Sequence, residues 1–189
     1  MTDFDAFFTE YGPPVNPEQA SPEILAEYKD RVPPALIEFW ERFGFSSYAD
    51  GLIWVINPKQ LEDVMVEWCP AKAKKARVVP VIRTAFGKVI YWTGTTFMLV
   101  DVHHNDRFES GGNVKLVFTF LLVDKLGKAG ILEVPDFKKA LKKFGPLAPD
   151  EMYGYKLPLA MGGNFNVANM EKMKIREHLS LLAQVHGIG

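Results

Sequence analysis

The 189-residue chain contains a single cysteine, Cys69, which excludes an internal disulfide and is typical of a reducing compartment. No apolar segment is long enough to cross a bilayer. The first residues, Met1 to Asp5, are acidic and lack the basic segment that begins a secretory signal. From these absences we expect a cytoplasmic protein that has no membrane partner.

Several patterns that carry chemistry are absent too. The sequence contains no Gly-x-Ser-x-Gly nucleophile elbow and no Gly-x-x-x-x-Gly-Lys-Ser/Thr phosphate loop. Cys69 stands between Trp68 and Pro70 without the signature of a catalytic thiol, so we interpret it as structural. A nucleophile, a base and an electrophile are nowhere visible together. We therefore predict a protein that is not an enzyme and needs no cofactor.

The histidines are weak candidates for a metal or a catalytic site. His103 and His104 are adjacent at the end of an expected strand, so their side chains point to opposite faces and do not converge on one ion. Alternation places His103 beside Asp101, and His178 is interpreted as a core-edge residue of the last helix. An enzyme that uses Asp101, His103 and His178 on a small ligand is an alternative, and it requires a deep pocket where these groups meet.

What the chain does contain is an uneven distribution of charge. Residues 1–70 carry 4 Lys and Arg against 13 Asp and Glu, a net charge of −9, whereas residues 71–189 carry 18 against 10, a net charge of +8. The split indicates two halves that attract each other or an acidic face for a basic partner, and an ordinary solvated surface is the simpler alternative. The basic run at 72–77 is typical of a linker, so we expect no direct nucleic-acid binding.

Helix signals dominate the first part of the chain. Proline or glycine bounds the expected helices, and apolar residues recur on one face of each. An Asp-Gly pair predicts a turn because both residues tolerate positive φ. We expect helices at 4–11, 22–31, 33–44 and 57–68, a turn at 46–51 and a buried strand at 52–56.

The second part is expected to open with an antiparallel meander. Gly87 and Gly94 separate runs of β-branched and aromatic residues, and the connections are too short for crossover helices. Residues 113–126 form a continuous apolar run, in which periodicity cannot separate a strand from a buried helix. We expect strands at 78–84, 88–92 and 96–103, a helix capped by Asp136 that stops at Gly145, and a last helix at 167–185 capped by Asn164 or Asn166. The predicted fold class is α+β, an antiparallel meander flanked by helices.

Four strings of the sequence together resemble a known bacterial family. They are Leu36–Pro58, with Phe39-Trp40 and Asp50-Gly51-Leu52-Ile53-Trp54; Phe86-Gly87 followed by Tyr91-Trp92; Leu141–Gly154, with Gly145-Pro146-Leu147 and Asp150-Glu151-Met152-Tyr153-Gly154; and Glu177–Gln184. The chain resembles the GAD-like family, whose carboxyl-terminal part is the domain of immunity proteins for type VI secreted DNase effectors. The first string is also similar, more distantly, to the Smi/Knr superfamily, which is α+β around a central antiparallel sheet. The resemblance is weakest from Asn105 to Val134.

This resemblance implies a function. An immunity protein binds a toxic nuclease in the cytoplasm of the cell that makes it and blocks its action. A nuclease presents a basic surface to its substrate, and the acidic first 70 residues suit such a partner. The resemblance divides the chain into a GAD-like region of helices and antiparallel sheet at 1–104 and a mostly helical immunity-type region at 105–189 packed on it. A regulatory or scaffold module with a different partner is the alternative.

Individual residues receive predicted roles, some from these strings and the contact residues from local charge. Four carboxylates on or near a helix face are predicted to contact the partner: Asp50, Glu62, Asp63 and Glu67. Four aromatic residues are expected in the core: Trp40, Trp54, Trp92 and Tyr153. Three glycines are expected in turns: Gly51, Gly145 and Gly154.

Overall fold

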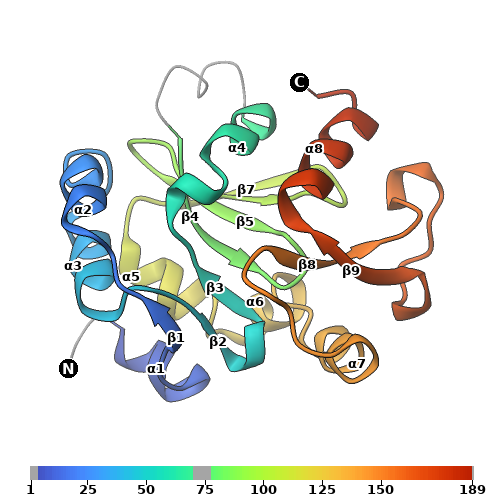
Figure 1. Cartoon of the computed structure of the whole chain (residues 1–189), viewed down its shortest axis with the longest axis horizontal. Coiled ribbons are helices and arrows are strands. Elements are labelled where there is room, and N and C mark those ends of the chain that lie inside the picture. Colours follow the sequence, from blue (N-terminus) through green and yellow to red (C-terminus); the bar gives the residue numbers. More distant parts are fainter. Residues whose placement is uncertain (1–3, 70–77, 189) are drawn as a thin grey trace.

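A seven-stranded antiparallel sheet forms the centre of the computed structural model, which describes residues 4–69 and 78–188 (Figure 1). Each strand pairs with the next one in sequence, so the sheet is a simple meander in the order β1 to β7. This arrangement, together with the surrounding helices, confirms the predicted α+β class. The strands are β1 (Val15–Glu18), β2 (Phe45–Tyr48), β3 (Ile53–Val55), β4 (Val79–Thr84), β5 (Val89–Trp92), β6 (Phe97–Asp101) and β7 (Asp106–Gly111).

Proline and glycine mark several helix ends of the first part, but the helix expected at 22–31 ends at Tyr28 and the one expected at 57–68 starts at Glu62, after a separate 3₁₀ turn. Ser21 caps the second helix by accepting a hydrogen bond from the backbone of Ile24 at 3.4 Å. Gly44 ends the third at φ 67°, where a Cβ would lie 2.4 Å from the carbonyl oxygen of Glu18, so only glycine fits. The helices here are α1 (Asp5–Tyr11), α2 (Pro22–Tyr28), α3 (Pro34–Phe43) and α4 (Glu62–Trp68), with 3₁₀ turns η1 (Ala49–Gly51) and η2 (Pro58–Gln60).

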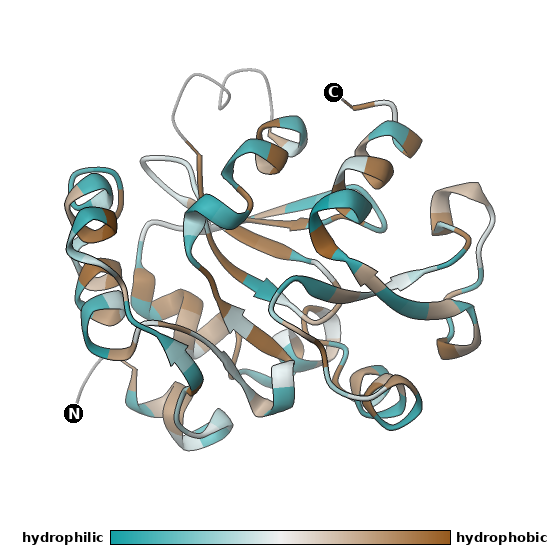
Figure 2. Cartoon of the chain, viewed as in Figure 1, coloured by the Kyte–Doolittle hydropathy of each residue, from teal (hydrophilic) through white to brown (hydrophobic). Residues whose placement is uncertain are grey.

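Alternation along the strands divides the core between the two faces of the sheet. Ile90 and Leu99 pack into a cluster with α1, α3 and the segment that follows β7, whereas Tyr91 and Val100 pack into a second cluster with α4 and α8 (Ile175–Val185). Figure 2 shows the most hydrophobic ribbon along these central strands. The sheet is therefore buried on both sides.

The segment at 113–126, which periodicity left open, is helical. It consists of α5 (Val114–Leu116), the π-helical turn η3 (Val117–Leu121) and the start of α6 (Lys125–Gly130). Phe118 anchors it, since its ring lies 5.0 Å from that of Phe4 and 4.9 Å from that of Phe39. The buried residues of the apolar run, Val114, Val117, Phe118 and Leu122, are the inner face of this helical segment, whereas Leu116, Phe120 and Leu126 are exposed.

A second, two-stranded sheet precedes the last helix. It consists of β8 (Glu151–Tyr155) and β9 (Met170–Lys174), which pair in antiparallel register. The remaining elements of this part are α7 (Val134–Phe144) and the 3₁₀ turns η4 (Leu159–Met161) and η5 (Val167–Asn169). In Figure 1 these elements lie beside the central sheet, on the side opposite α2 and α3.

Several local predictions are wrong. The expected turn at 46–51 begins as β2, because β1 and β3 supply partners on both sides. The expected helix at 167–185 starts only at Ile175, because residues 170–174 pair with β8 and Asn166 caps the preceding η5. Asp136 lies in the first turn of α7, whose N-cap is Glu133. Gly154 lies inside β8 and not in a turn.

The other predicted roles fare better. Trp40, Trp92 and Tyr153 are buried, whereas Trp54 is half-buried and stacks on the Arg83 guanidinium at 4.3 Å. Gly51 and Gly145 have positive φ at chain reversals, as expected. The predicted linker at 72–77 lies outside the described residues.

The predicted division after residue 104 stays a prediction. β7 follows that point and pairs with β6 along its whole length, so both expected regions contribute strands to the central sheet. Among the described residues, no helix has both the length and the apolar character that a membrane span needs.

Candidate functional site

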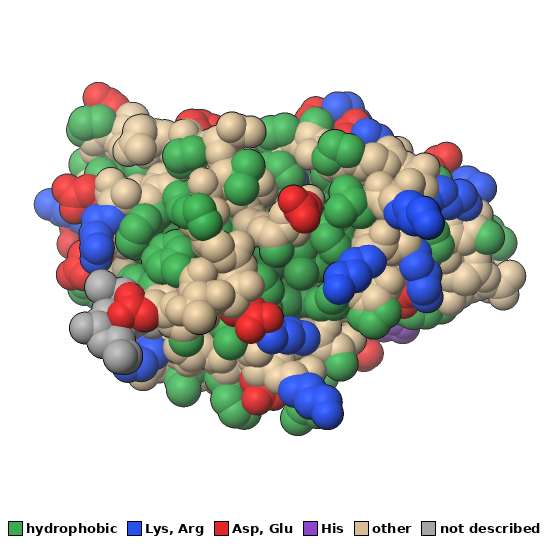
Figure 3. Space-filling view, turned by 90° about the horizontal axis from the view of Figure 1, so that it is seen from below, with side chains coloured by type: hydrophobic (Ala, Val, Ile, Leu, Met, Phe, Trp, Pro, Cys, Tyr) green, Lys and Arg blue, Asp and Glu red, His purple; other side chains and the backbone are tan. Residues whose placement is uncertain are grey.

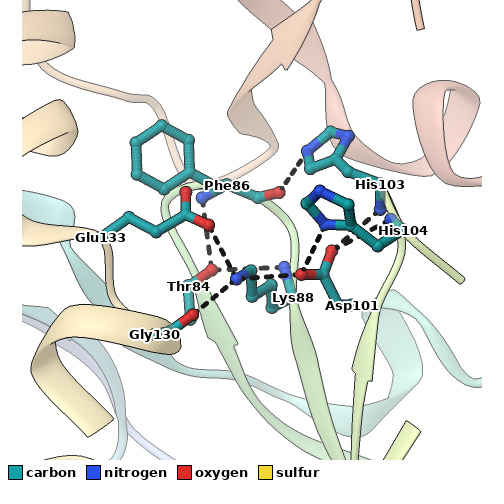
Figure 4. A network of polar contacts seen from close by, with 8 residues as sticks. All are labelled: Thr84, Phe86, Lys88, Asp101, His103, His104, Gly130 and Glu133. Atoms are coloured by element: carbon teal, nitrogen blue, oxygen red, sulfur yellow. Dashed lines mark hydrogen bonds and ion pairs between the residues drawn. The ribbon is translucent and has the colours of Figure 1, made fainter. Parts of the chain in front are cut away.

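A buried lysine is the centre of a polar network beside the central sheet (Figure 4). Lys88 is 4% exposed, and its Nζ donates hydrogen bonds to the Gly130 carbonyl and to Glu133 Oε1, both at 2.8 Å. The same Nζ forms an ion pair with Asp101 Oδ2 at 3.0 Å. Three acceptors match the three hydrogens of an ammonium group, so the buried charge is fully satisfied.

The network joins elements that are far apart in the sequence. Lys88 precedes β5, Asp101 ends β6, and Glu133 caps α7 in the left-handed backbone region at φ 51°. Thr84 Oγ1 accepts a hydrogen bond from the Lys88 backbone at 3.2 Å, which holds the turn between β4 and β5. The lysine therefore ties two central strands to the helices that follow them.

Electrostatics keep this network charged. Desolvation opposes the Lys88 ammonium, but Glu133 and Asp101 together raise the pKa of Lys88 above its ordinary value. Desolvation also opposes the Asp101 carboxylate, yet Lys88 and His104 hold the pKa of Asp101 below its ordinary value. For Glu133 burial dominates and raises the pKa, although Lys88 works in the other direction.

The histidines next to the network behave differently from one another. His103 is buried and its Nε2 lies 2.9 Å from the Phe86 carbonyl oxygen, which fixes the proton on that nitrogen. His104 is exposed and its Nδ1 lies 3.0 Å from Asp101 Oδ2. The expected strand to residue 103 ends at Asp101, so the two histidines lie in the turn before β7 and strand alternation does not apply to them. Within the described ranges, no three His, Cys, Asp or Glu side chains are grouped to hold a metal ion.

His103, His178 and Tyr155 form a buried cluster. The His103 ring centroid lies 4.8 Å from that of Tyr155 and 6.1 Å from that of His178. Burial lowers the pKa of His103 to about 3 and that of His178 to about 4, so both imidazoles are neutral at pH 7. The three groups therefore do not meet in one deep pocket, because the two imidazoles are enclosed in the packed core whereas Asp101 lines a surface groove.

A groove of about 540 Å³ lies over the Lys88 network, between β7 and the helical segment at 120–131. We call it the β7–α6 groove. Its floor is formed by buried residues of the central strands: Lys88, Leu99 and Asp101. Its walls are formed by β7 on one side and the helical segment on the other: Asp106, Phe108, Glu109, Ser110, Phe120, Leu121, Asp124, Leu126, Gly127, Gly130 and Ile131.

The walls of this groove expose large apolar side chains. Phe108 is 56% exposed, Phe120 63% and Leu126 79%. β7 is the last strand of the sheet, so no further strand of the described chain covers this wall. Asp106 and Glu109 on the same strand are exposed, and neither has an ion-pair partner within residues 4–69 and 78–188. Clustered exposed apolar groups with a polar rim are typical of protein-interaction sites.

A second hollow of about 490 Å³ lies between β1, η1 and residues 141–149. It contains Asp50, one of the predicted contact residues, together with Glu18 and Trp54. Figure 3 shows the underside of the molecule, where hydrophobic side chains gather across the centre and Lys and Arg side chains gather toward the end at which α7 lies. The charged residues that line this hollow are Glu18 and Asp50.

The structure does not bring the four predicted contact residues together. Asp50 lies on η1 before β3, whereas the other three lie on α4 after it. Glu62 forms an ion pair with Arg31. Asp63 forms one with Arg176 at 2.6 Å, and the hydrogen bond from that guanidinium lowers the pKa of Asp63. Glu67 is half-buried on α4, and the role of all four in partner contact stays a prediction.

Sequence reasoning named Asp101 but missed the residues that form the walls of the β7–α6 groove. Asp106, Phe108 and Glu109 lie in a stretch without apolar alternation, so no strand is predicted there. Phe120 and Leu126 lie in the apolar run that periodicity left open. The sequence gives one indication of these residues. The run at 114–126 contains more aromatic and aliphatic side chains than a helix packed on one face can bury, so some of them must be exposed.

Comparisons with known proteins confirm the resemblance drawn from the four strings. The GAD-like domain model matches residues 2–105, more than half of the chain. The model of the C-terminal domain of the T6SS immunity protein Tdi1 matches residues 116–186. No curated protein matches the chain at a significant level.

The fold is shared with a solved structure. It is described as the crystal structure of Atu4351 from Agrobacterium tumefaciens, with a TM-score of 0.75 and 19% sequence identity. The alignment covers 96% of this chain and 88% of that one. At this identity the likeness shows the fold alone, and it extends through both matched regions.

Proposed function

We propose, from the premise that this chain belongs to the GAD-like domain family and carries a type VI secretion immunity domain, that it binds a nuclease effector in the cytoplasm and neutralises it. The observation that carries this proposal is the match of residues 116–186 to the Tdi1 C-terminal domain. Neutralisation here is binding of one protein by another, without catalysis by this chain.

The distribution of polar groups supports a binding role. Two histidines whose pKa values are strongly lowered, His103 and His178, are enclosed in the core and neutral, so neither faces a substrate. The Lys88 ammonium contacts three internal acceptors, so it has no hydrogen left for a ligand. The exposed features of the β7–α6 groove are instead apolar side chains and carboxylates, which can recognise a protein surface.

Electrostatics support a basic partner. A nuclease that binds a polyphosphate backbone carries Lys and Arg at its active cleft, and a carboxylate-bearing protein competes for that surface. Exposed carboxylates increase the rate of encounter with such a partner, and apolar contacts then slow its dissociation. A tight, stoichiometric complex follows from the two effects together.

The test is co-expression with the nuclease encoded beside this chain. We expect cells to survive when both proteins are made, and a 1:1 complex to co-elute in size-exclusion chromatography without cutting plasmid DNA. Cells that die as they do with the nuclease alone would overturn the proposal. A complex that forms but still degrades DNA would overturn neutralisation and favour the regulatory or scaffold module.

A further inference from the structure

We infer that the β7–α6 groove is the docking surface for the partner, and that it receives a segment of the nuclease that carries a large apolar side chain next to Lys or Arg. This inference rests on the proposed function, because it assigns the contact that neutralisation requires. It commits to a basic protein segment as the occupant.

The first argument is the apolar exposure. Phe108, Phe120 and Leu126 come from both walls of one groove, and each exposes more than half of its side chain. Isolated exposed leucines are ordinary, but three large side chains around one concavity form a patch that favours burial against a partner. A partner side chain inserted between Phe108 on β7 and Phe120 on the opposite wall would contact both.

The second argument is charge complementarity. Four carboxylates line the groove, those of Asp101, Asp106, Glu109 and Asp124, against the single ammonium of Lys88. Asp101 and the buried Glu133 neutralise Lys88, so the accessible charge of the groove comes from Asp106, Glu109 and Asp124 and is negative. A cation beside the apolar anchor of the partner would therefore be attracted, and an acidic segment would be repelled.

The third argument is the rigidity of the floor. The Lys88 network ties β5 and β6 to the Gly130 carbonyl at the end of α6 and to Glu133 at the start of α7. The helical wall is thus fixed relative to the strands beneath the groove. A preformed site loses little conformational entropy when it binds, which favours high affinity.

The other large hollow is a weaker candidate. Among the residues that line it, Val15 is the one exposed large hydrophobic side chain. Its charged lining residues are two carboxylates, those of Glu18 and Asp50. A basic partner would be attracted there too, but it would find fewer exposed apolar anchors than in the β7–α6 groove.

The groove also lies where the two matched regions meet. Its floor residues fall within 2–105, and its helical wall falls within the immunity match at 116–186. β7 stands between the two matches and supplies the second wall. Docking at this place therefore requires both regions in their observed arrangement.

The experiment compares serine variants of the groove with matched variants elsewhere. Leu126→Ser and Phe120→Ser are measured against Leu181→Ser, an exposed leucine on α8, which packs on the other face of the sheet. Binding of each full-length variant to the nuclease is measured by calorimetry, and folding by thermal melting. We expect each groove variant to raise Kd at least about tenfold and Leu181→Ser to change it less than about threefold.

Charge is tested in the same assay. Asp106→Lys with Glu109→Lys is expected to lower the association rate and to weaken its salt dependence, whereas Glu171→Lys on β9 leaves both unchanged. If the wild-type chain binds and protects while all groove variants bind equally well, the inference is overturned and the proposed function stands. If the wild-type chain does not bind the nuclease, the proposed function itself fails.

Discussion

Acid should destabilise this protein through its two buried histidines. The perturbation is a decrease in pH from 7 to 5, over which an ordinary histidine of pKa 6.5 becomes protonated. In the folded chain the pKa is about 3 for His103 and about 4 for His178, so both stay neutral at pH 5. Only the unfolded chain takes up these protons, and the uptake pulls the equilibrium toward unfolding.

The magnitude follows from these values. The interval from pH 6.5 to pH 5 is about 1.5 pH units, and each histidine lowers the free energy of unfolding by about 1.4 kcal/mol per pH unit across it, or by about 2 kcal/mol in total. Two histidines together give about 4 kcal/mol. This is a large fraction of the free energy of unfolding of an ordinary domain, which is roughly 5–15 kcal/mol. Because the folded pKa values lie below the unfolded one, this stability is complete above about pH 6.5 and decreases as the pH falls toward the folded values.

The cause of the shifts is mainly desolvation. It is the largest effect for both histidines; for His103, Asp101 raises the pKa in part, while His178 and Lys88 lower it. Glu133 acts in the opposite sense at acid pH, because burial raises the pKa of its carboxyl and the fold then favours its protonated form. The histidine effect must therefore be isolated by variants.

The assay is urea unfolding at pH 7, 6 and 5 for the wild type, for His178→Leu and for His178→Leu with His103→Gln. The free energy of unfolding of the wild type should fall by about 4 kcal/mol more than that of the double variant between pH 7 and pH 5. The single variant His178→Leu keeps one buried histidine, so its free energy of unfolding should fall by about 2 kcal/mol more than that of the double variant. Equal losses in the wild type and the double variant would refute the assignment of buried neutral imidazoles.

Three further changes test the packing. Lys88→Met leaves two buried carboxylates without their cation and should lower the free energy of unfolding by about 3–5 kcal/mol in urea titrations. Gly154→Ala places a Cβ 2.7 Å from His178 Nε2, so thermal melting should show a loss of about 1–3 kcal/mol. Asp63→Asn removes only an exposed pair with Arg176 and should cost less than about 1 kcal/mol in the same titrations.

The parts of the fold that local signals encode could be predicted from the sequence. Gly44 and Gly145 stop helices because each adopts positive φ at the helix end, and such stops need no knowledge of the rest of the chain. The strands β4 to β6 are apolar and separated by short connections, so their pairing as a meander also follows from local information.

The elements that the sequence did not reveal depend on partners. β1 is four exposed residues that include Pro17, and it is a strand only because β2 pairs with it. β9 has a polar sequence that also fits a helical register, and its conformation is decided by β8, whose Tyr155 lies opposite Met170. The intrinsic strand propensity of a residue is a weak guide to its conformation where pairing with a distant strand supplies the backbone hydrogen bonds.

The candidate site could be approached only through family resemblance. The nuclease partner was inferred from the four strings, and the contact residues were chosen from local charge. Glu62 and Asp63 satisfy that criterion, yet both form ion pairs within the chain. The β7–α6 groove joins Lys88 to Glu133 and Phe108 to Phe120, and no spacing in one sequence reports such long-range contacts.

The helical wall of the groove shows how the buried network and the exposed apolar groups depend on each other. α6 spans only Lys125–Gly130 and contains two glycines, so it is too short to be stable in isolation. It is held by its contact with the preceding segment, where a Cβ on Gly127 would lie 1.8 Å from the Leu121 carbonyl oxygen, and by the Lys88 hydrogen bond to Gly130. Leu126 contributes little to that stability because it is exposed, so its apolar side chain on a firmly held helix is better explained by a partner than by folding.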